Sequence, residues 1–130
     1  MADFDGLYVD LTDRIIGCAV KVHKALGPGF VESVYENALA IEMSEQDILF
    51  QQQLHVQLTY SGHVVGVHRL DMLVDDKVVV ELKAKEQISE SDKATTLSYL
   101  KATSKSLALI INFGKPRVEI KRLGNTETED

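Results

Sequence analysis

The sequence predicts one α+β domain of mixed three-layer α/β/α architecture, with the element order ααβββαββ. Three observations predict it: a helical repeat of apolar residues over the first 45 positions, strand-length apolar segments between positions 49 and 83, and a last helix followed by two short strands. With 130 residues, the chain is long enough for one hydrophobic core and too short for two. We expect the domain to span residues 10–123, between a loose lead-in at 1–9 and a flexible acidic tail at 124–130.

The first helix is predicted by apolar residues at helical spacing: Leu11, Ile15, Cys18, Ala19, Val22 and Leu26. Asp10 or Thr12 is expected to cap its start, and Gly27-Pro28-Gly29 ends it. Cys18 lies on the apolar stripe without a His or Asp partner, so we expect a small core residue rather than a nucleophile.

The second helix is expected from about residue 31 to residue 45. Its buried stripe is predicted to consist of Val31, Val34, Ala38 and Ile41. A neighbouring face carries Glu32, Tyr35, Glu36 and Leu39, which lie one turn apart. Taken alone, Glu32 and Glu36 are solvated acids near a helix N-terminus, where negative charge is favourable.

Strands and one more helix fill the rest of the chain. An alternating segment at 49–60, the turn Ser61-Gly62, and apolar segments at 64–74 and 78–83 predict an antiparallel meander of three strands. A third helix is expected at 90–102, with Ser89 as its cap. The last two strands are expected at 107–113 and 118–123, on either side of Gly114-Lys115-Pro116.

The hairpin at 69–83 places charge where a buried strand would not. Glu81 and Lys83 share one face, because side chains alternate along a strand. If the turn has three residues (75–77), Asp71 lies opposite Glu81. A two-residue turn would instead place the two carboxylates on opposite faces. The chemistry proposed for this hairpin therefore requires the longer turn or a bulge.

Two acids and a lysine on one strand face suit a metal and a phosphate. Asp71, Glu81 and the Leu82 carbonyl would bind Mg²⁺, a hard ion that takes oxygen ligands. Such an ion polarises the phosphate and activates a water, while Lys83 would stabilise the developing charge. By itself the spacing is a weak signal, and the alternative is an exposed cluster of ion pairs that contributes little to stability.

The bulk composition predicts a soluble, cytoplasmic protein. Lys plus Arg is 14 and Asp plus Glu is 20, which gives a net charge of −6 and makes general nucleic-acid binding unfavourable. The charge is uneven, however, because one segment is rich in basic residues: Lys101, Lys105, Lys115, Arg117, Lys121 and Arg122, against the single acid Glu119. The start of the chain lacks the features of a signal peptide, and the longest apolar run, 107–111, is too short for a membrane.

Cysteine and histidine usage argues against a zinc site. The single cysteine excludes an internal disulfide and a cysteine-based zinc site. The histidines show no zinc-binding spacing, and structural roles are expected for all of them: His23, His55, His63 and His68.

The segment 22–36, Val-His-Lys-Ala-Leu-Gly-Pro-Gly-Phe-Val-Glu-Ser-Val-Tyr-Glu, closely resembles the signature of the GxxExxY family. Gly29, Glu32 and Tyr35 match its defining positions. This family is classed within the PD-(D/E)XK nuclease-like superfamily. The resemblance continues through 69–86 and 98–114 and covers roughly residues 11–123.

The resemblance implies a restriction-endonuclease-like core. Carried over by residue, the core motif falls on Asp71, Glu81 and Lys83. The acid of the preceding helix falls on Glu32, which is expected to reach the metal or its waters. Glu36 is a weaker candidate on the same face. Tyr35 is expected to pack or to hydrogen-bond the site, and Tyr35, Tyr99 and Thr95 are the candidate substrate-binding residues.

Two positions depart from the pattern of the superfamily. Leu70 stands where its name has proline, a common change of little consequence. Thr95 stands where relatives often carry glutamine, four residues before the tyrosine that matches Tyr99. A hydroxyl is shorter than an amide and does not make the same reach to a phosphate or a metal-bound water.

We therefore expect a Mg²⁺- or Mn²⁺-dependent phosphodiesterase that acts on nucleic acid. The alternative is a catalytically weak or inactive nuclease-fold module that binds nucleic acid or a protein partner without cutting. A homodimer or a larger protein complex is also expected, and no membrane association.

Overall fold

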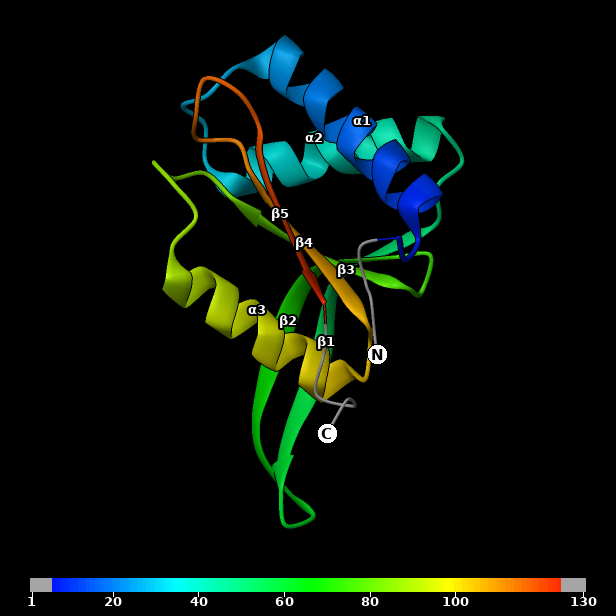
Figure 1. Ribbon diagram of the computed structural model, residues 1–130, viewed down its shortest axis with the longest axis vertical. Coiled ribbons are helices and arrows are strands. Elements are labelled where there is room, and N and C mark those ends of the chain that lie inside the picture. Colours follow the sequence, from blue (N-terminus) through cyan, green and yellow to red (C-terminus); the bar gives the residue numbers. More distant parts are fainter. Residues whose placement is uncertain (1–5, 125–130) are drawn as a thin grey trace.

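The structure is a computed structural model that describes residues 6–124. Its element order is the predicted ααβββαββ (Figure 1). The helices are α1 (Val9–Leu26), α2 (Glu32–Glu45) and α3 (Glu90–Thr103). The strands are β1 (Phe50–Tyr60), β2 (His63–Val74), β3 (Val78–Lys83), β4 (Leu107–Asn112) and β5 (Glu119–Gly124).

The five strands form one mixed sheet in the order β1-β2-β3-β4-β5. β1, β2 and β3 pair antiparallel as the predicted meander, and β4 and β5 also pair antiparallel. β3 and β4 run parallel, and α3 connects them. The outer parts of β1 and β2 extend beyond the rest of the sheet, at the bottom of Figure 1.

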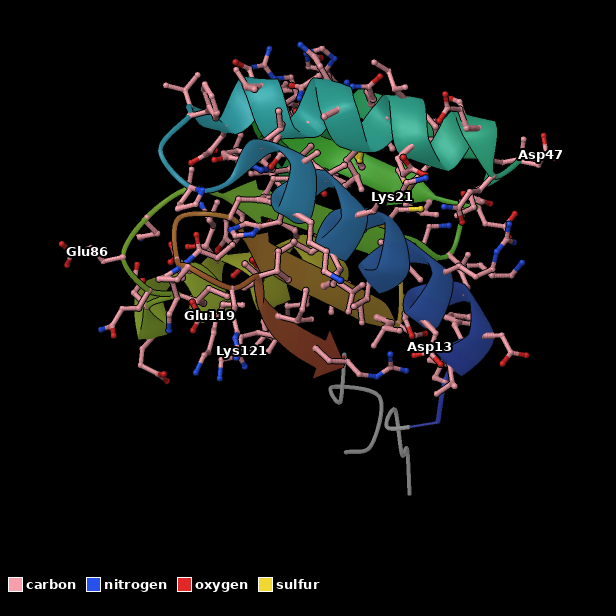
Figure 2. All side chains as sticks on the ribbon, turned by 90° about the horizontal axis from the view of Figure 1, so that it is seen from above. Asp13, Lys21, Asp47, Glu86, Glu119 and Lys121 are labelled. Atoms are coloured by element: carbon pink, nitrogen blue, oxygen red, sulfur yellow. The ribbon has the colours of Figure 1, made fainter. Side chains whose placement is uncertain are left out.

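Helices cover both faces of the sheet and make two separate cores. The larger core joins α1 and α2 to one face of the sheet, and the smaller core joins α3 to the other face. Figure 2 shows α1 and α2 stacked on the same side of the strands. The predicted three-layer α/β/α arrangement is confirmed. Within residues 6–124, no helix has the length and apolar character needed to cross a bilayer.

The start of α1 differs from the prediction. The helix begins at Val9 after Tyr8, which makes no side-chain cap bond, so neither Asp10 nor Thr12 is the cap. Thr12 is buried inside the first turn, and its hydroxyl donates to the Val9 carbonyl. Cys18 is fully buried, as expected. The predicted lead-in and acidic tail fall largely outside the described residues.

The buried face of α2 also differs from the prediction. Tyr35, Leu39 and Met43 are buried, whereas Val31 and Ile41 of the expected stripe are 68% and 62% exposed. Apolar residues lie on more than one side of α2, so helical spacing alone does not select the buried side. The larger aromatic ring of Tyr35 goes into the core because it removes more apolar surface from water.

Candidate active site

The turn between β2 and β3 decides whether the two acids of the hairpin meet. These strands pair Met72 with Val80, which leaves a three-residue turn at 75–77. Continuing this register by one residue places Asp71 opposite Glu81. The longer turn that the sequence analysis required is confirmed.

Asp71 and Glu81 are linked by hydrogen bonds between side chain and backbone. The Asp71 N–H donates to Glu81 Oε2 at 2.9 Å, and the Leu82 N–H donates to Asp71 Oδ2 at 2.8 Å. Each carboxylate thus accepts a backbone N–H, as backbone carbonyls do between regularly paired strands. The second oxygen of each accepts no hydrogen bond from residues 6–124, so both acids keep free capacity for a ligand.

The sheet changes face at Asp71. Residues two apart on a regular strand share a face, yet Met72 packs in the α1/α2 core and Leu70 in the α3 core. On β1 the opposite residue is Gln53, whose φ of 54° lies in the left-handed region that non-glycine residues rarely adopt. The change of face leaves Asp71 half-buried and outside both cores.

Burial controls the protonation of the two acids. Glu81 is only 7% exposed, and burial, followed by the negative charge of Asp71, raises its pKa to about 8. Burial also raises the pKa of Asp71, against the opposing effect of its hydrogen bond from the Leu82 N–H. The pair therefore holds a proton at neutral pH, mainly on Glu81.

Lys83 lies between the acid pair and the start of α3. Its Nζ is 3.8 Å from Asp92 Oδ1, and Lys85 Nζ is 2.9 Å from Asp92 Oδ2. Asp92 completes a capping box with Ser89, the predicted cap. Burial opposes the ionisation of Asp92, but hydrogen bonds from Ser89 and Lys85 lower its pKa to about 2. The first turn of α3 therefore holds both lysines through one permanently charged carboxylate.

Glu32 faces the same end of the sheet from the first turn of α2. Its pKa is raised, first by partial burial, and it is also influenced by the charges of Lys83 and Asp71. These influences fall off with distance, so they place Glu32 close to the hairpin acids even though no direct contact joins them. Glu32 is thus within electrostatic reach of Asp71 and Lys83, and its role at the site stays a prediction.

Glu36, the weaker candidate, connects α2 to β1. Its carboxylate accepts hydrogen bonds from Gln52 Nε2 at 2.8 Å and from Gln53 Nε2 at 2.7 Å. Its charge raises the pKa of Asp71, so it too lies near the acid pair. Both carboxylate oxygens are occupied, which gives Glu36 the role of holding the left-handed Gln53 in place.

Buried Asn112 fixes the chain that follows Lys83. Its Oδ1 accepts the N–H groups of Lys85 (3.0 Å) and Gly114 (3.1 Å), and its Nδ2 donates to the Lys85 carbonyl and to Glu119 Oε1, each at 3.0 Å. A Cβ at position 114 would collide with the backbone of Lys85, so glycine is required there. This network fixes the position of the carboxyl end of β3, where Lys83 lies.

Tyr35 supports the loop before α2 rather than facing a substrate. It is fully buried and stacks on Phe113 with ring centroids 4.5 Å apart. Its hydroxyl donates to the Gly27 carbonyl at 2.5 Å. Gly29 in the same loop has φ 115°, a conformation that favours glycine. The packing role expected for Tyr35 is therefore the observed one, and its expected contact with substrate is not compatible with this burial.

Tyr99 and Thr95 both lie on α3, but they differ in how near they are to the acid pair. Tyr99 stacks on His68, with centroids 3.6 Å apart. Burial raises the pKa of Tyr99, and so do the charges of Glu81 and Asp71, which places its ring near the acid pair. Thr95 is exposed one turn earlier, and within residues 6–124 it makes no hydrogen bond to the acids.

The oxygen atoms around Asp71 fit a hard divalent cation. The Lys83 carbonyl accepts the N–H of Phe113, the residue that follows β4. Because successive residues direct their backbone groups to opposite strand edges, the Leu82 carbonyl lies on the Asp71 side, like its N–H. Two carboxylates and one carbonyl are ligands that Mg²⁺ takes together with waters. Among the described residues, no three His, Cys, Asp or Glu side chains already converge as a metal centre.

Sequence reasoning missed Asp92, Gln53 and Asn112. The capping-box spacing from Ser89 was a signal for Asp92, since the acid three residues after a cap reaches back to it. The strand positions of Gln53 and Asn112 gave no signal, because a left-handed strand residue and a buried amide depend on tertiary contacts.

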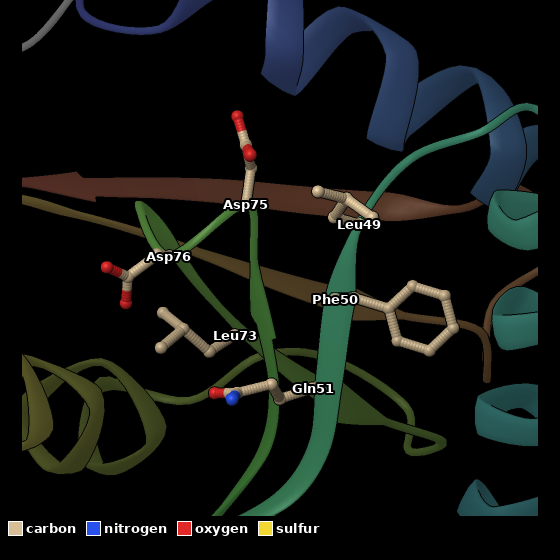
Figure 3. A pocket seen from close by; sticks show the side chains of 6 residues that line it. All are labelled: Leu49, Phe50, Gln51, Leu73, Asp75 and Asp76. Carbon is tan, nitrogen blue, oxygen red and sulfur yellow. The ribbon is translucent and has the colours of Figure 1, made fainter.

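A shallow pocket lies at the other end of the same hairpin, beside its turn. Its volume is about 240 Å³, and it is lined by Leu49, Phe50, Gln51, Leu73, Asp75 and Asp76. Figure 3 shows that Asp75 and Asp76 point in different directions, so their carboxylates do not converge on one ligand. Carboxylates converge instead at Asp71 and Glu81.

Comparisons with known proteins agree with this fold. The crystal structure of SSO0001 is similar in fold, with a TM-score of 0.53 and 15% sequence identity over 90% of this chain and 59% of that one. The chain thus spans about three fifths of that protein. A search of the curated proteins gave no match. The family model of the PD-(D/E)XK nuclease superfamily matches residues 9–123, and the chain therefore belongs to the PD-(D/E)XK nuclease superfamily.

Proposed function

We propose that this chain is a metal-dependent phosphodiesterase that cleaves nucleic acid. One observation carries the proposal: Asp71 and Glu81 lie opposite each other, joined through backbone N–H groups, beside a lysine on the same strand face. Membership of the superfamily supports the reaction class. The narrower GxxExxY assignment, which rests on Gly29, Glu32 and Tyr35, belongs to the same proposal.

Asp71, Glu81 and the Leu82 carbonyl are the proposed ligands of Mg²⁺ or Mn²⁺, with Glu32 positioned to hold a metal-bound water. When bound, the cation would polarise the phosphate and lower the pKa of the attacking water. The protein holds its ligands ready by hydrogen bonds that use only one oxygen of each carboxylate. Binding of the cation would release the proton that Glu81 carries at neutral pH.

Lys83 is the proposed partner of the scissile phosphate. Its Nζ is 3.8 Å from Asp92, a longer contact than the 2.9 Å between Lys85 and the same carboxylate. Lys83 can therefore leave Asp92 for a phosphate while Lys85 keeps that acid paired. An ammonium group at this position stabilises the negative charge that develops on the phosphate.

The non-cutting accessory module remains the second candidate, because Thr95 lies exposed and makes no hydrogen bond to the acid pair. The two candidates separate in a cleavage assay on DNA and RNA, single- and double-stranded, with Mg²⁺, Mn²⁺ or EDTA. The phosphodiesterase predicts metal-dependent cleavage that Asp71→Ala abolishes. Binding without cleavage, unaffected by metal and by Lys83→Ala, would establish the accessory module.

The assembly state and location stay predictions from the sequence. We propose a homodimer or a larger complex, and a cytoplasmic setting. Analytical ultracentrifugation over a range of concentrations checks the dimer, and a strict monomer at every concentration would contradict it.

A further inference from the structure

A second feature near the carboxyl end of the parallel strands is a pocket between α1 and the loop that joins β4 to β5. Its volume is about 460 Å³, within the range of small-molecule sites. Its lining combines apolar side chains with cations: Val20, His23, Lys24, Pro116, Arg117 and Val118. In Figure 1 this loop lies alongside the C-terminal end of α1.

The pocket carries positive charge, whereas the net charge of the molecule is negative. The chain carries a net charge of −6, yet neither Lys24 nor Arg117 has an acidic partner among residues 6–124. Lys24 lies in the last turn of α1, where a helix stabilises positive charge. No such local reason applies to Arg117. Two exposed cations without counter-ions at one cavity provide a site for an anion.

The walls of the pocket are fixed rather than adaptable. Buried His23 stacks on Phe113 and donates through Nε2 to the Lys115 carbonyl at 2.8 Å, because a carbonyl oxygen only accepts. This bond joins α1 to the β4–β5 loop across the floor of the pocket. Pro116 and Val118 then supply apolar surface beside the two cations.

Strand pairing and hydrogen bonds connect the pocket loop to the strand end that carries Lys83. Lys83 and Asn112 are paired at the carboxyl ends of β3 and β4, and the pocket loop follows Asn112 directly. Lys115 of that loop lies 3.9 Å from Glu119, which accepts from Asn112 Nδ2. Lys83 and the pocket loop thus lie at the carboxyl ends of neighbouring strands.

We propose that the pocket binds one nucleotide unit of the substrate strand, away from the scissile phosphate. Lys24 and Arg117 hold a backbone phosphate, and the base lies against Val20, Pro116 and Val118. The inference rests on the proposed function, since it assigns a second contact to the same substrate. It favours single-stranded nucleic acid, because only an unpaired base is free to lie against this apolar wall.

The test is fluorescence anisotropy of a labelled single-stranded oligonucleotide in EDTA, where no cleavage occurs. The double variant Lys24→Ala/Arg117→Ala is expected to weaken binding about tenfold and to reduce the salt slope by about 0.7, the value for the one phosphate contact that is lost. The matched control is Lys77→Ala/Lys105→Ala, which removes two lysines that pair with the turn acids. It changes the net charge equally and should bind like the wild type.

Equal weakening in both double variants would overturn the inference, because the effect would then be one of net charge. Unchanged binding in the pocket variant, or no binding by the wild type, would overturn it as well. A parallel titration with adenosine monophosphate distinguishes the source of the phosphate: loss of this ligand alone, with oligonucleotide binding intact, contradicts the strand assignment. A wild type that binds through the pocket but never cleaves would refute the proposed function and leave the pocket standing.

Discussion

The β2–β3 hairpin carries acids at both of its ends, and the two ends differ in solvent exposure and in the charge of the neighbouring side chains. At the turn, Asp76 is 84% exposed and pairs with Lys105 at 3.1 Å, and Asp75 pairs with Lys77 at 3.0 Å. At the other end Glu81 is 7% exposed, and its nearest charged neighbour in the pairing register is another acid. The acids at the turn are solvated and paired with lysines, whereas at the other end burial and the neighbouring acid keep Glu81 protonated at neutral pH.

The comparison shows that the presence of several carboxylates in a segment does not by itself identify a functional site. The turn acids gain little from their lysines, because exposed ion pairs contribute at most about 1 kcal/mol. The buried acids cost stability, because desolvation and mutual repulsion oppose their ionisation. On the proposed function this cost is explained, because the same arrangement would give a cation a strong place to bind.

Asp71→Ala is expected to have the largest effect. The proposed metal loses a ligand and the Leu82 N–H loses its acceptor, so cleavage should fall by several kcal/mol of transition-state stabilisation, roughly a thousandfold. Steady-state cleavage with Mn²⁺ measures it, and circular dichroism verifies that the variant is folded. A folded variant that retains wild-type cleavage would remove Asp71 from the mechanism.

Lys83→Ala should lower cleavage by roughly 10² to 10³-fold, the range for loss of one electrostatic stabiliser. Metal binding should be kept, because both carboxylates remain. The informative comparison is Lys85→Ala, which loses the shorter contact with Asp92 but not the proposed phosphate contact. If the Lys85 variant were the more damaged of the two, the assignment of Lys83 would be wrong.

Glu81→Gln should stabilise the metal-free protein while abolishing cleavage. The folded pKa of about 8 lies above the usual 4.5, so the folded state binds the proton more tightly and wild-type stability falls as pH rises from about 4.5 to about 8. Glutamine removes this loss, and we expect a gain of roughly 1–3 kcal/mol near pH 8 and little below pH 5.

Thermal unfolding in EDTA across this pH range checks the effect of Glu81→Gln. Asp76→Asn is the matched control, because it neutralises an exposed acid of the same hairpin. A wild-type unfolding temperature that rises from pH 5 to pH 8, relative to Glu81→Gln, would contradict the raised pKa of Glu81.

Asp92→Asn is expected to cost about 1 kcal/mol, the usual value for a helix cap. Its carboxylate accepts from Ser89 and pairs with both lysines. With a folded pKa of about 2, the contribution of Asp92 is fully present above its ordinary value of 3.8 and is lost as pH falls toward 2. Urea unfolding at neutral pH measures the cost, and a variant of unchanged stability would contradict the capping role.

The smallest effect is predicted at the turn. Asp75→Asn and Asp76→Asn should each change stability by less than about 0.5 kcal/mol and leave cleavage at the wild-type rate. The same cleavage and unfolding assays apply. A loss of cleavage at the turn comparable to that of Asp71→Ala would erase the contrast between the two ends.

The sequence predicted the order of elements because apolar spacing, Gly27-Pro28-Gly29 and the Ser89 cap are local signals. It also predicted that Asp71 faces Glu81, conditional on a three-residue turn that only the structure establishes. The predicted buried face of α2 was wrong, because the exposed residues Val31 and Ile41 have the same spacing as residues of a core stripe.

The remaining features of the site depend on contacts between distant segments. The face change at Gln53 is held by Glu36 on α2, and the pairing of Lys83 with Asp92 is set by the position of α3. No periodicity in one strand encodes either of them. The superfamily resemblance supplied Glu32, which its own helix position would have assigned to solvent.

Calorimetric titration of Mn²⁺ at about pH 8.5, where Glu81 is largely ionised, tests the central claim most directly. The wild type and Asp76→Ala should each bind Mn²⁺ with similar affinity, and Asp71→Ala should bind it much more weakly or not at all. Equal binding by all three proteins, or loss in Asp76→Ala alone, would contradict a metal site at the buried end of the hairpin.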